Sequence, residues 1–437
     1  MLVLALVAAP ARAATVGVFD GPFLSAVTLA GPDVVVLEQT FRPQRSRLVV
    51  VPRGGGKAQT LLTVPGMHYV FEEPRRLAGS ANRVALIAEI EDKHDQTVEW
   101  RVYSGPPRGP IGVVRSLPVR EAWVPALVDV DGDRVLIVEA RPESDGPIRA
   151  FTFDSVAGLV PIAWAKASAA PIELSGSFVA ASMAGPNRVG VLDLATGAEL
   201  ATVPLPGDER GEDLSLAPDG RVAVASQAGV LIAGPGAPAR LVPGTKGLTR
   251  VHLTGQTLSG VDKHGRAVAL LVTGGGLSAL GLPTGVFVDA AGDATGYAWI
   301  ANGCAHVAAL PPTTAPAPED DPCPTTEISY AYIAGTTLHG RTVKVPIGCV
   351  AAPRGVCRGT AIGRIFEGNG KVAASGRFEI PVGKSRTVKL RVTKAALKVF
   401  EREGYGGLTM DARIKHGRIG QGSNGDAELD VHLPGRD

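Results

Sequence analysis

The segment Leu214-Ser-Leu-Ala-Pro-Asp-Gly-Arg-Val-Ala-Val-Ala225 joins two short apolar runs through a turn that contains Gly220. Two β-prone runs around such a turn are typical of a β-hairpin. The same order recurs along residues 15–310: an apolar residue, a glycine turn and then a β-rich run. The seven units have as their leading residues Leu29, Leu77, Val130, Leu174, Leu216, Leu253 and Val288.

The spacing of these units indicates how they are arranged. Successive leading residues are 48, 53, 44, 42, 37 and 35 positions apart, a mean of about 43, which is the period of a β-propeller. Most units continue with another strand, so each holds three or four strands. One such sheet cannot bury both of its faces, but sheets packed around an axis cover one another.

We therefore predict an all-β chain with a seven-bladed β-propeller at residues 14–310. The seventh unit is short of an outer strand, and residues 14–19 are expected to supply it and so to close the ring. An array of β-sandwiches is the alternative, because its turns also recur at short intervals. Sandwiches, however, do not require a repeat of 43 residues.

Two segments resemble those of the WD40-like and TolB-like seven-bladed propellers. Residues 214–225 are similar to their Ser-Pro-Asp-Gly strand pair, with Ala217 in place of the serine. Residues 191–197 are similar to their D-x-x-T-G turn on an outer strand. The Gly-His and Trp-Asp dipeptides of true WD40 repeats are missing. The resemblance covers the fold of about two thirds of the chain and implies no catalytic residues.

The remainder of the chain has a different pattern. Residues 311–325 are predicted to form a linker, since five prolines in twelve residues favour a stiff polyproline II conformation. Residues 326–437 contain seven alternating segments, which predict a two-sheet β-sandwich that resembles the Ig-like modules of exported bacterial proteins. A short helix is expected over residues 393–403, with Thr393 as N-cap and Gly404 as stop.

The N-terminus and the cysteines both indicate export. Residues 1–13 have the apolar core and small-residue cleavage site of a signal peptide, with a buried strand as the alternative. Cys304, Cys323, Cys349 and Cys357 form an even set, so we expect disulfides between neighbours, the second of which closes a hairpin. Spacings of 19, 26 and 8 residues do not suit a zinc site. The predicted location is either secreted or in the periplasm and cell envelope.

Composition excludes several classes of protein. The 437 residues are 45% hydrophobic, which excludes a wholly disordered chain, and no apolar run is long enough for a spanning helix. A net charge of +2 and an aromatic content of 5% provide no overall case for binding nucleic acid.

The sharpest local motif for a site is Asp129-Val-Asp-Gly-Asp133. Asp129, Asp131 and Asp133 alternate around a tight glycine turn and could present oxygen ligands to calcium. The alternative is an ordinary hairpin turn, for which Asp-Gly is a favoured dipeptide. No other cofactor is predicted.

These features favour an exported, non-enzymatic binding or scaffold protein whose propeller loops recognise a protein or a small ligand. The sequence contains no Gly-x-Ser-x-Gly elbow and no phosphate loop. Two alternatives stay open. One is an extracytoplasmic propeller hydrolase such as a lactonase, with a dispersed active site that either uses a metal ion or does not. The other is a TolB-like component of the cell envelope.

Overall fold

The computed structural model separates the chain into two compact units. One comprises residues 1–17 and 22–321, and the other comprises residues 18–21 and 322–437. The residues that the structure describes are 14–15, 23–41, 44–54, 56–65, 76–92, 96–141, 148–164, 168–183, 187–206, 213–263, 266–273, 278–280, 287–301, 304–310, 325–330, 336–351, 356–365, 372–381, 384–403, 405–414, 418–421 and 428–432. The predicted signal peptide and most of the predicted linker lie outside these ranges.

The described part of the first unit consists of seven four-stranded antiparallel sheets. The first three sheets are β2 (Phe23–Ala30), β3 (Asp33–Phe41), β4 (Gln44–Pro52) and β5 (Gln59–Pro65); β6 (Leu77–Gly79), β7 (Val84–Glu91), β8 (Thr97–Gly105) and β9 (Gly112–Pro118); and β10 (Val124–Asp131), β11 (Arg134–Ala140), β12 (Arg149–Asp154) and β13 (Gly158–Ile162).

The next three sheets follow in chain order. They are β14 (Ser168–Ser175), β15 (Phe178–Met183), β16 (Arg188–Asp193) and β17 (Glu199–Pro204); β18 (Leu214–Leu216), β19 (Val222–Ser226), β20 (Gly229–Gly234) and β21 (Ala237–Leu241); and β22 (Thr249–Thr254), β23 (Thr257–Val261), β24 (Ala267–Leu271) and β25 (Ser278–Ala279). The last sheet contains β26 (Phe287–Gly292), β27 (Gly296–Ala301), β28 (Cys304–Ala309) and β1 (Ala14–Thr15).

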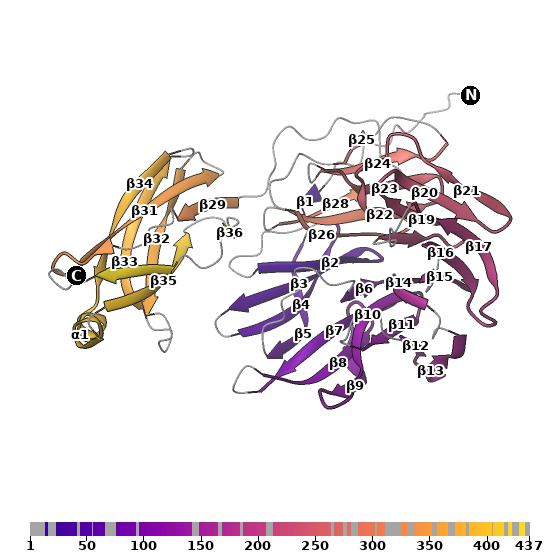
Figure 1. Cartoon of the computed structure of the whole chain (residues 1–437), viewed down its shortest axis with the longest axis horizontal. Coiled ribbons are helices and arrows are strands. Elements are labelled where there is room, and N and C mark those ends of the chain that lie inside the picture. Colours follow the sequence, from indigo (N-terminus) through magenta and orange to yellow (C-terminus); the bar gives the residue numbers. More distant parts are fainter. Residues whose placement is uncertain are drawn as a thin grey trace, which may run out of the picture. The chain divides into compact units, whose positions relative to one another are not determined.

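The first strands of neighbouring sheets contact one another all the way around the unit. β2 contacts β6, and the series continues through β10, β14, β18, β22 and β26 until β26 contacts β2 again (Figure 1). A closed series of small sheets is the arrangement of a β-propeller. The first unit is therefore a β-propeller.

The N-terminal strand takes part in this closure. β1 pairs antiparallel with β28, with Ala14 opposite Val307 and Thr15 opposite His306. The prediction that the N-terminal segment supplies the missing outer strand is confirmed for these two residues, and residues 16–19 lie outside the described part.

The glycine turns of the repeat lie mostly between the first and second strands of the sheets. Gly31, Gly132, Gly176, Gly220 and Gly255 have φ values between 52° and 79°, a left-handed conformation that side chains with a Cβ disfavour. The recurring motif thus marks the same hairpin in five of the seven sheets, because glycine adopts this turn at little cost.

The core of the first unit lies between sheets. Each of six buried clusters draws its apolar side chains from two neighbouring sheets, as where Leu37 and Val50 meet Leu77 and Leu86. This is the reason for closure anticipated from the sequence: the apolar faces of each sheet are covered by its neighbours.

The described strands of the second unit form one nine-stranded sheet. Its order is β30 (Thr336–Thr337), β37 (Glu428–His432), β35 (Tyr405–Ile414), β32 (Val356–Ile365), β33 (Val372–Pro381), β34 (Lys384–Val392), β31 (Thr342–Ala351), β29 (Thr325–Tyr330) and β36 (Arg418–Gln421). β29 and β36 pair in parallel, as do β30 and β37.

This topology corrects the predicted sandwich. The sequence predicted seven strands in two separate sheets, whereas all nine described strands belong to one hydrogen-bonded order that surrounds a single core. The short strands β30 and β36 have two and four residues, too few for alternation to reveal them. The helix was predicted correctly: α1 (Lys394–Glu403) begins after Thr393, whose Oγ1 accepts a hydrogen bond from the Ala396 N–H at 3.2 Å.

Candidate functional site

Carboxylates on or directly before the first strands join neighbouring propeller sheets. The Leu174 N–H of β14 donates to Asp129 Oδ2 at 2.7 Å, and the Gly176 N–H donates to Asp131 Oδ2 at 2.8 Å. The arrangement recurs where Leu216 donates to Glu173, Val251 to Asp213, and Val27 to Asp289. These bonds satisfy backbone donors that the strands of one sheet cannot satisfy alone.

This arrangement bears on the predicted calcium site. Asp129 and Asp131 each direct a carboxylate oxygen at the next sheet, whereas Asp133 is exposed on the turn. Among the described residues, no three acidic, histidine or cysteine side chains gather as metal ligands. The geometry favours a structural role for Asp129 and Asp131. The calcium site stays a prediction, which the melting temperature with calcium and with a chelator tests.

Three of the four cysteines belong to the second unit, and Cys304 begins β28 of the propeller. Cys349 of β31 and Cys357 of β32 are joined by a disulfide with a Cα–Cα distance of 5.7 Å. The bond does not close a hairpin as predicted, because β33 and β34 separate β31 from β32 in the sheet. It instead ties together two strands that do not pair. The side chain of Cys304 and the whole of Cys323 lie outside the described part, so that pairing stays a prediction.

The best candidate for a functional surface surrounds one of three glutamates that occupy the same position on the second strands of their sheets. Glu38, Glu89 and Glu139 are each the sixth residue of β3, β7 and β11. Glu38 and Glu139 are almost fully buried, with exposed fractions of 2% and 0%. Each of the three carboxylates is paired with an arginine: Glu38 with Arg47 at 2.6 Å, Glu89 with Arg76 at 3.9 Å, and Glu139 with Arg115 and Arg149.

The environment of Glu139 is the most elaborate of the three. Arg115 Nε of β9 lies 2.8 Å from Glu139 Oε1, and Arg149 Nε of β12 contacts Glu139 Oε2. Arg149 and Glu139 are cross-strand partners, whereas Arg115 reaches in from the neighbouring sheet. Two guanidinium groups thus contact one buried carboxylate, and Arg149 also lies 3.8 Å from the exposed carboxylate of Glu121.

The same arginines lie against aromatic rings. The guanidinium carbon of Arg149 lies 4.6 Å from the centre of the Trp123 ring, and that of Arg141 lies 5.2 Å from it. Phe151 has Arg115 at 5.3 Å and Arg149 at 5.7 Å. We refer to Arg115, Trp123, Glu139, Arg141, Arg149 and Phe151 as the arginine–aromatic cluster.

The cluster is accessible from solvent. Trp123 and Phe151 are half-buried, and Arg141 is exposed. The outer strand β9 also carries an exposed Val113, and Val119 is exposed directly after it. Tryptophan and arginine next to apolar side chains are the residue types that dominate the energetics of protein interfaces. Arginines over aromatic rings can bind, but they offer no acid, base or nucleophile for hydrolysis.

A smaller group of the same kind lies in the preceding sheet. Arg76 is 4% exposed, and its guanidinium carbon lies 5.1 Å from the centre of the Trp100 ring. Burial lowers the pKa of Arg76, and the charge of Glu89 opposes that shift. Arg76 is too deeply buried to serve as a contact for a partner.

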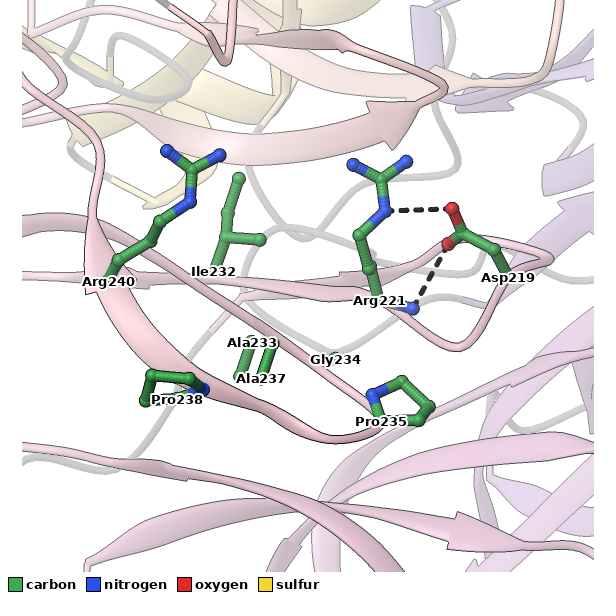
Figure 2. Close-up of a pocket in the computed structure, with 9 residues that line it drawn as sticks. All are labelled: Asp219, Arg221, Ile232, Ala233, Gly234, Pro235, Ala237, Pro238 and Arg240. Carbon is green, nitrogen blue, oxygen red and sulfur yellow. Dashed lines mark hydrogen bonds and ion pairs between the residues drawn. The ribbon is translucent and has the colours of Figure 1, made fainter.

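A pocket of about 430 Å³ lies on the sheet formed by β18–β21. Figure 2 shows that Arg221 and Arg240 extend to the same side of it. Arg221 is engaged, since Nε donates to Asp219 at 2.8 Å and Nη2 donates to the Gly255 carbonyl of the next sheet at 2.6 Å. Arg134 makes the equivalent bond to the Gly176 carbonyl at 3.2 Å, which indicates that these arginines connect sheets. We therefore prefer the arginine–aromatic cluster as the candidate site.

The cluster is not apparent from the sequence, because its members lie on β9, β11, β12 and the segments beside them. The recurrence of glutamate at one position of three units, each with an arginine partner, was the available indication. This recurrence becomes visible only when the units are aligned by their second strands.

No protein-family model matches the chain, and no curated protein matches it. Solved structures with a similar fold include the propeller of the trilobed protease from Pyrococcus furiosus, at 9% identity and a TM-score of 0.43, covering 64% of this chain and 89% of that one. Prp20p from Saccharomyces cerevisiae matches at 10% identity and a TM-score of 0.40, covering 65% of this chain and 81% of that one.

A third similar structure is PorZ, a surface component of the type-IX secretion system of Porphyromonas gingivalis. It matches at 12% identity and a TM-score of 0.35, with coverage of 77% of this chain and 56% of PorZ. At these values the likenesses concern the fold alone. In the described part of the chain, no helix has both the length and the apolar character that crossing a membrane requires.

Proposed function

We propose that this chain is an exported, non-enzymatic binding protein: a seven-bladed β-propeller that recognises a protein partner through the arginine–aromatic cluster. The observation that carries the proposal is the stacking of Arg141 and Arg149 on the half-buried Trp123. Such a pair presents a large, rigid contact area together with positive charge, and it loses little conformational freedom on binding.

The carboxylates near the first strands support binding rather than hydrolysis. Asp129, Glu173, Asp213 and Asp289 are engaged by backbone donors of the neighbouring sheet. A propeller hydrolase would need such groups directed at a substrate instead. Their structural use makes the lactonase alternative less favourable.

Export is part of the proposal. Cleavage after Ala13 would leave Ala14 as the first residue, and Ala14 begins the strand that pairs with β28. Processing at that site would therefore preserve the closing strand. N-terminal sequencing of the mature protein tests this point, and a chain that keeps residues 1–13 would contradict it.

The partner is tested with matched charge reversals. Arg141→Glu alters an exposed cluster residue that holds no buried carboxylate, and Arg240→Glu makes the same change on β21, outside the cluster. Proteins of the source's envelope and culture medium are retained on immobilised wild-type and variant chains and quantified by mass spectrometry, and each candidate is then purified and titrated.

We expect a purified partner whose affinity falls by about tenfold or more with Arg141→Glu and stays within about threefold with Arg240→Glu. Equal loss in both variants would contradict the proposal, as would a partner that binds both normally. Turnover of lactone substrates by the purified wild-type chain would favour the hydrolase alternative.

A further inference from the structure

The parts of the chain before and after residue 322 carry opposite net charges, although the whole chain has a net charge of only +2. Residues 322–437 contain 18 lysines and arginines against 10 aspartates and glutamates, a net charge of +8. Residues 1–321 contain 26 and 32 of these residues, a net charge of −6. Such asymmetry between parts of a chain indicates interaction with a charged partner.

Part of the positive charge lies on one face of the second unit's sheet. β33, β34 and β31 are neighbours in that order (Figure 1). Alternation along β34 buries Val388, Leu390 and Val392, and leaves Lys389 and Arg391 exposed on the other side. Lys344 of β31 and Arg377 of β33 are exposed as well. We refer to Lys344, Arg377, Lys389 and Arg391 as the cationic face.

The register brings like charges together on this face. Lys344 lies directly opposite Lys389, and Arg391 pairs across to Thr342 on one side and to Ser375 on the other. Directly opposed like charges in a sheet are destabilising. In the described part of the chain, no carboxylate is paired with any of the four cations, and the nearby Glu379 forms its ion pair with Arg358 at 2.8 Å.

The four cations have no carboxylate partner in the described part of the chain, so an anionic ligand lying across the strands would neutralise their charge. Neighbouring strands are about 4.8 Å apart, so the row offers closely spaced charges along a line. The described outward residues of β31, β33 and β34 include no aromatic side chain on which the bases of a nucleic acid could stack. A linear polymer with a charge on each residue matches this surface best.

From these observations we propose that the cationic face binds a linear acidic polysaccharide. Its carboxylates would lie over Arg377, Lys389 and Lys344 and relieve the repulsion between the two lysines. The proposal does not depend on the protein partner of the propeller.

The experiment measures binding of the full chain to polygalacturonate at physiological ionic strength. The test variant is Lys344→Glu with Lys389→Glu. The matched control is Lys394→Glu with Lys398→Glu, which makes the same change in charge on exposed residues of α1. α1 packs Ala396 and Phe400 into the core, on the side of the sheet away from the cationic face.

We expect the affinity for polygalacturonate to fall by about tenfold or more in the test variant and by less than about threefold in the control. Equal losses would show that only net charge matters and would overturn the proposal. Tighter binding of the wild type to a DNA duplex or to phosphatidylserine vesicles than to polygalacturonate would also overturn it.

A single substitution separates a loss of binding from a loss of folding. Lys344→Glu places a carboxylate opposite Lys389, so it should raise the melting temperature slightly while it weakens polygalacturonate binding. If it strengthens the fold and leaves binding unchanged, the cationic face is not the binding surface.

Discussion

At the scale of single residues, identical side chains acquire different roles from their neighbours in space. Asp129 and Asp133 belong to the same short motif, yet Asp129 accepts backbone hydrogen bonds from Leu174 and Val130, and Asp133 is exposed. Likewise, Glu139 is buried between two arginines, whereas Glu121 is exposed and lies 3.8 Å from Arg149. These contrasts can be measured.

Asp129→Ala should lower the free energy of unfolding of the propeller by about 1–3 kcal/mol, because the Leu174 N–H loses its acceptor. Asp133→Ala should change it by no more than about 0.5 kcal/mol, since the side chain is exposed. Urea denaturation measures both values. Similar effects of the two substitutions, abolished by a calcium chelator, would favour the calcium site instead.

Glu139→Gln should destabilise the propeller by about 3 kcal/mol, because it leaves the charges of Arg115 and Arg149 without their common partner. Glu121→Gln serves as the control and should cost less than about 0.5 kcal/mol, since its ion pair is exposed. Chemical denaturation of the two variants checks the difference. A cost for Glu139→Gln as small as that of the control would mean that the buried pair is not essential.

At the scale of elements, the turns carry much of the information that specifies the repeat. The turn after β16 has the D-x-x-T-G sequence noted above: the Thr196 N–H and hydroxyl donate to Asp193 Oδ1 at 2.8 and 2.7 Å. The turn before β11 depends on Gly132, whose φ is 58°. Both turns use a residue type that the local backbone geometry requires.

Gly132→Ala should destabilise the propeller by about 1 kcal/mol, because a Cβ is disfavoured at positive φ. The added methyl group itself would meet no atom within 4 Å, so the cost is conformational. Gly112→Ala on β9 also meets nothing within 4 Å and has no positive φ, so it should be neutral or stabilising. Thermal melts of the pair test this; equal effects would contradict it.

The turn at Asp193 should contribute to the dependence of stability on pH. Hydrogen bonds from Thr196 hold the pKa of Asp193 below its usual value. A group with a lowered pKa in the folded state stabilises above its unfolded pKa of about 3.9, and this contribution is lost as the pH falls through the folded value. Wild type should therefore exceed Asp193→Asn in melting temperature at pH 6, and the gap should narrow as the pH falls below the unfolded pKa of about 3.9. A gap that persists in acid would show that the charge is not responsible.

At the scale of the whole molecule, each of the two units is stabilised by its own set of interactions. The propeller relies on apolar clusters shared between sheets and on carboxylates that cross their boundaries. The second unit has one core and a disulfide between strands that do not pair. Removal of the Cys349–Cys357 disulfide should therefore lower the stability of the second unit only.

Replacing both Cys349 and Cys357 by serine should lower the stability of the second unit by about 2–3 kcal/mol, as expected for a short closed loop. The propeller should unfold as before. Calorimetry of the full chain with and without the substitutions would show which transition moves. A shift of the propeller transition by the same amount would contradict the assignment.

The order of apolar runs and glycine turns was sufficient to predict the propeller, its closing strand and the capped helix α1, because hairpins and caps depend on residues close together in the chain. The sequence did not reveal the single sheet of the second unit, the carboxylates between sheets or the arginine–aromatic cluster. These depend on side chains brought together from separate strands: Arg115 and Glu139 are 24 residues apart, and Val27 and Asp289 are 262 apart. Such partners meet only because one sheet packs against another, and residues near each other in the sequence do not determine which sheets pack together.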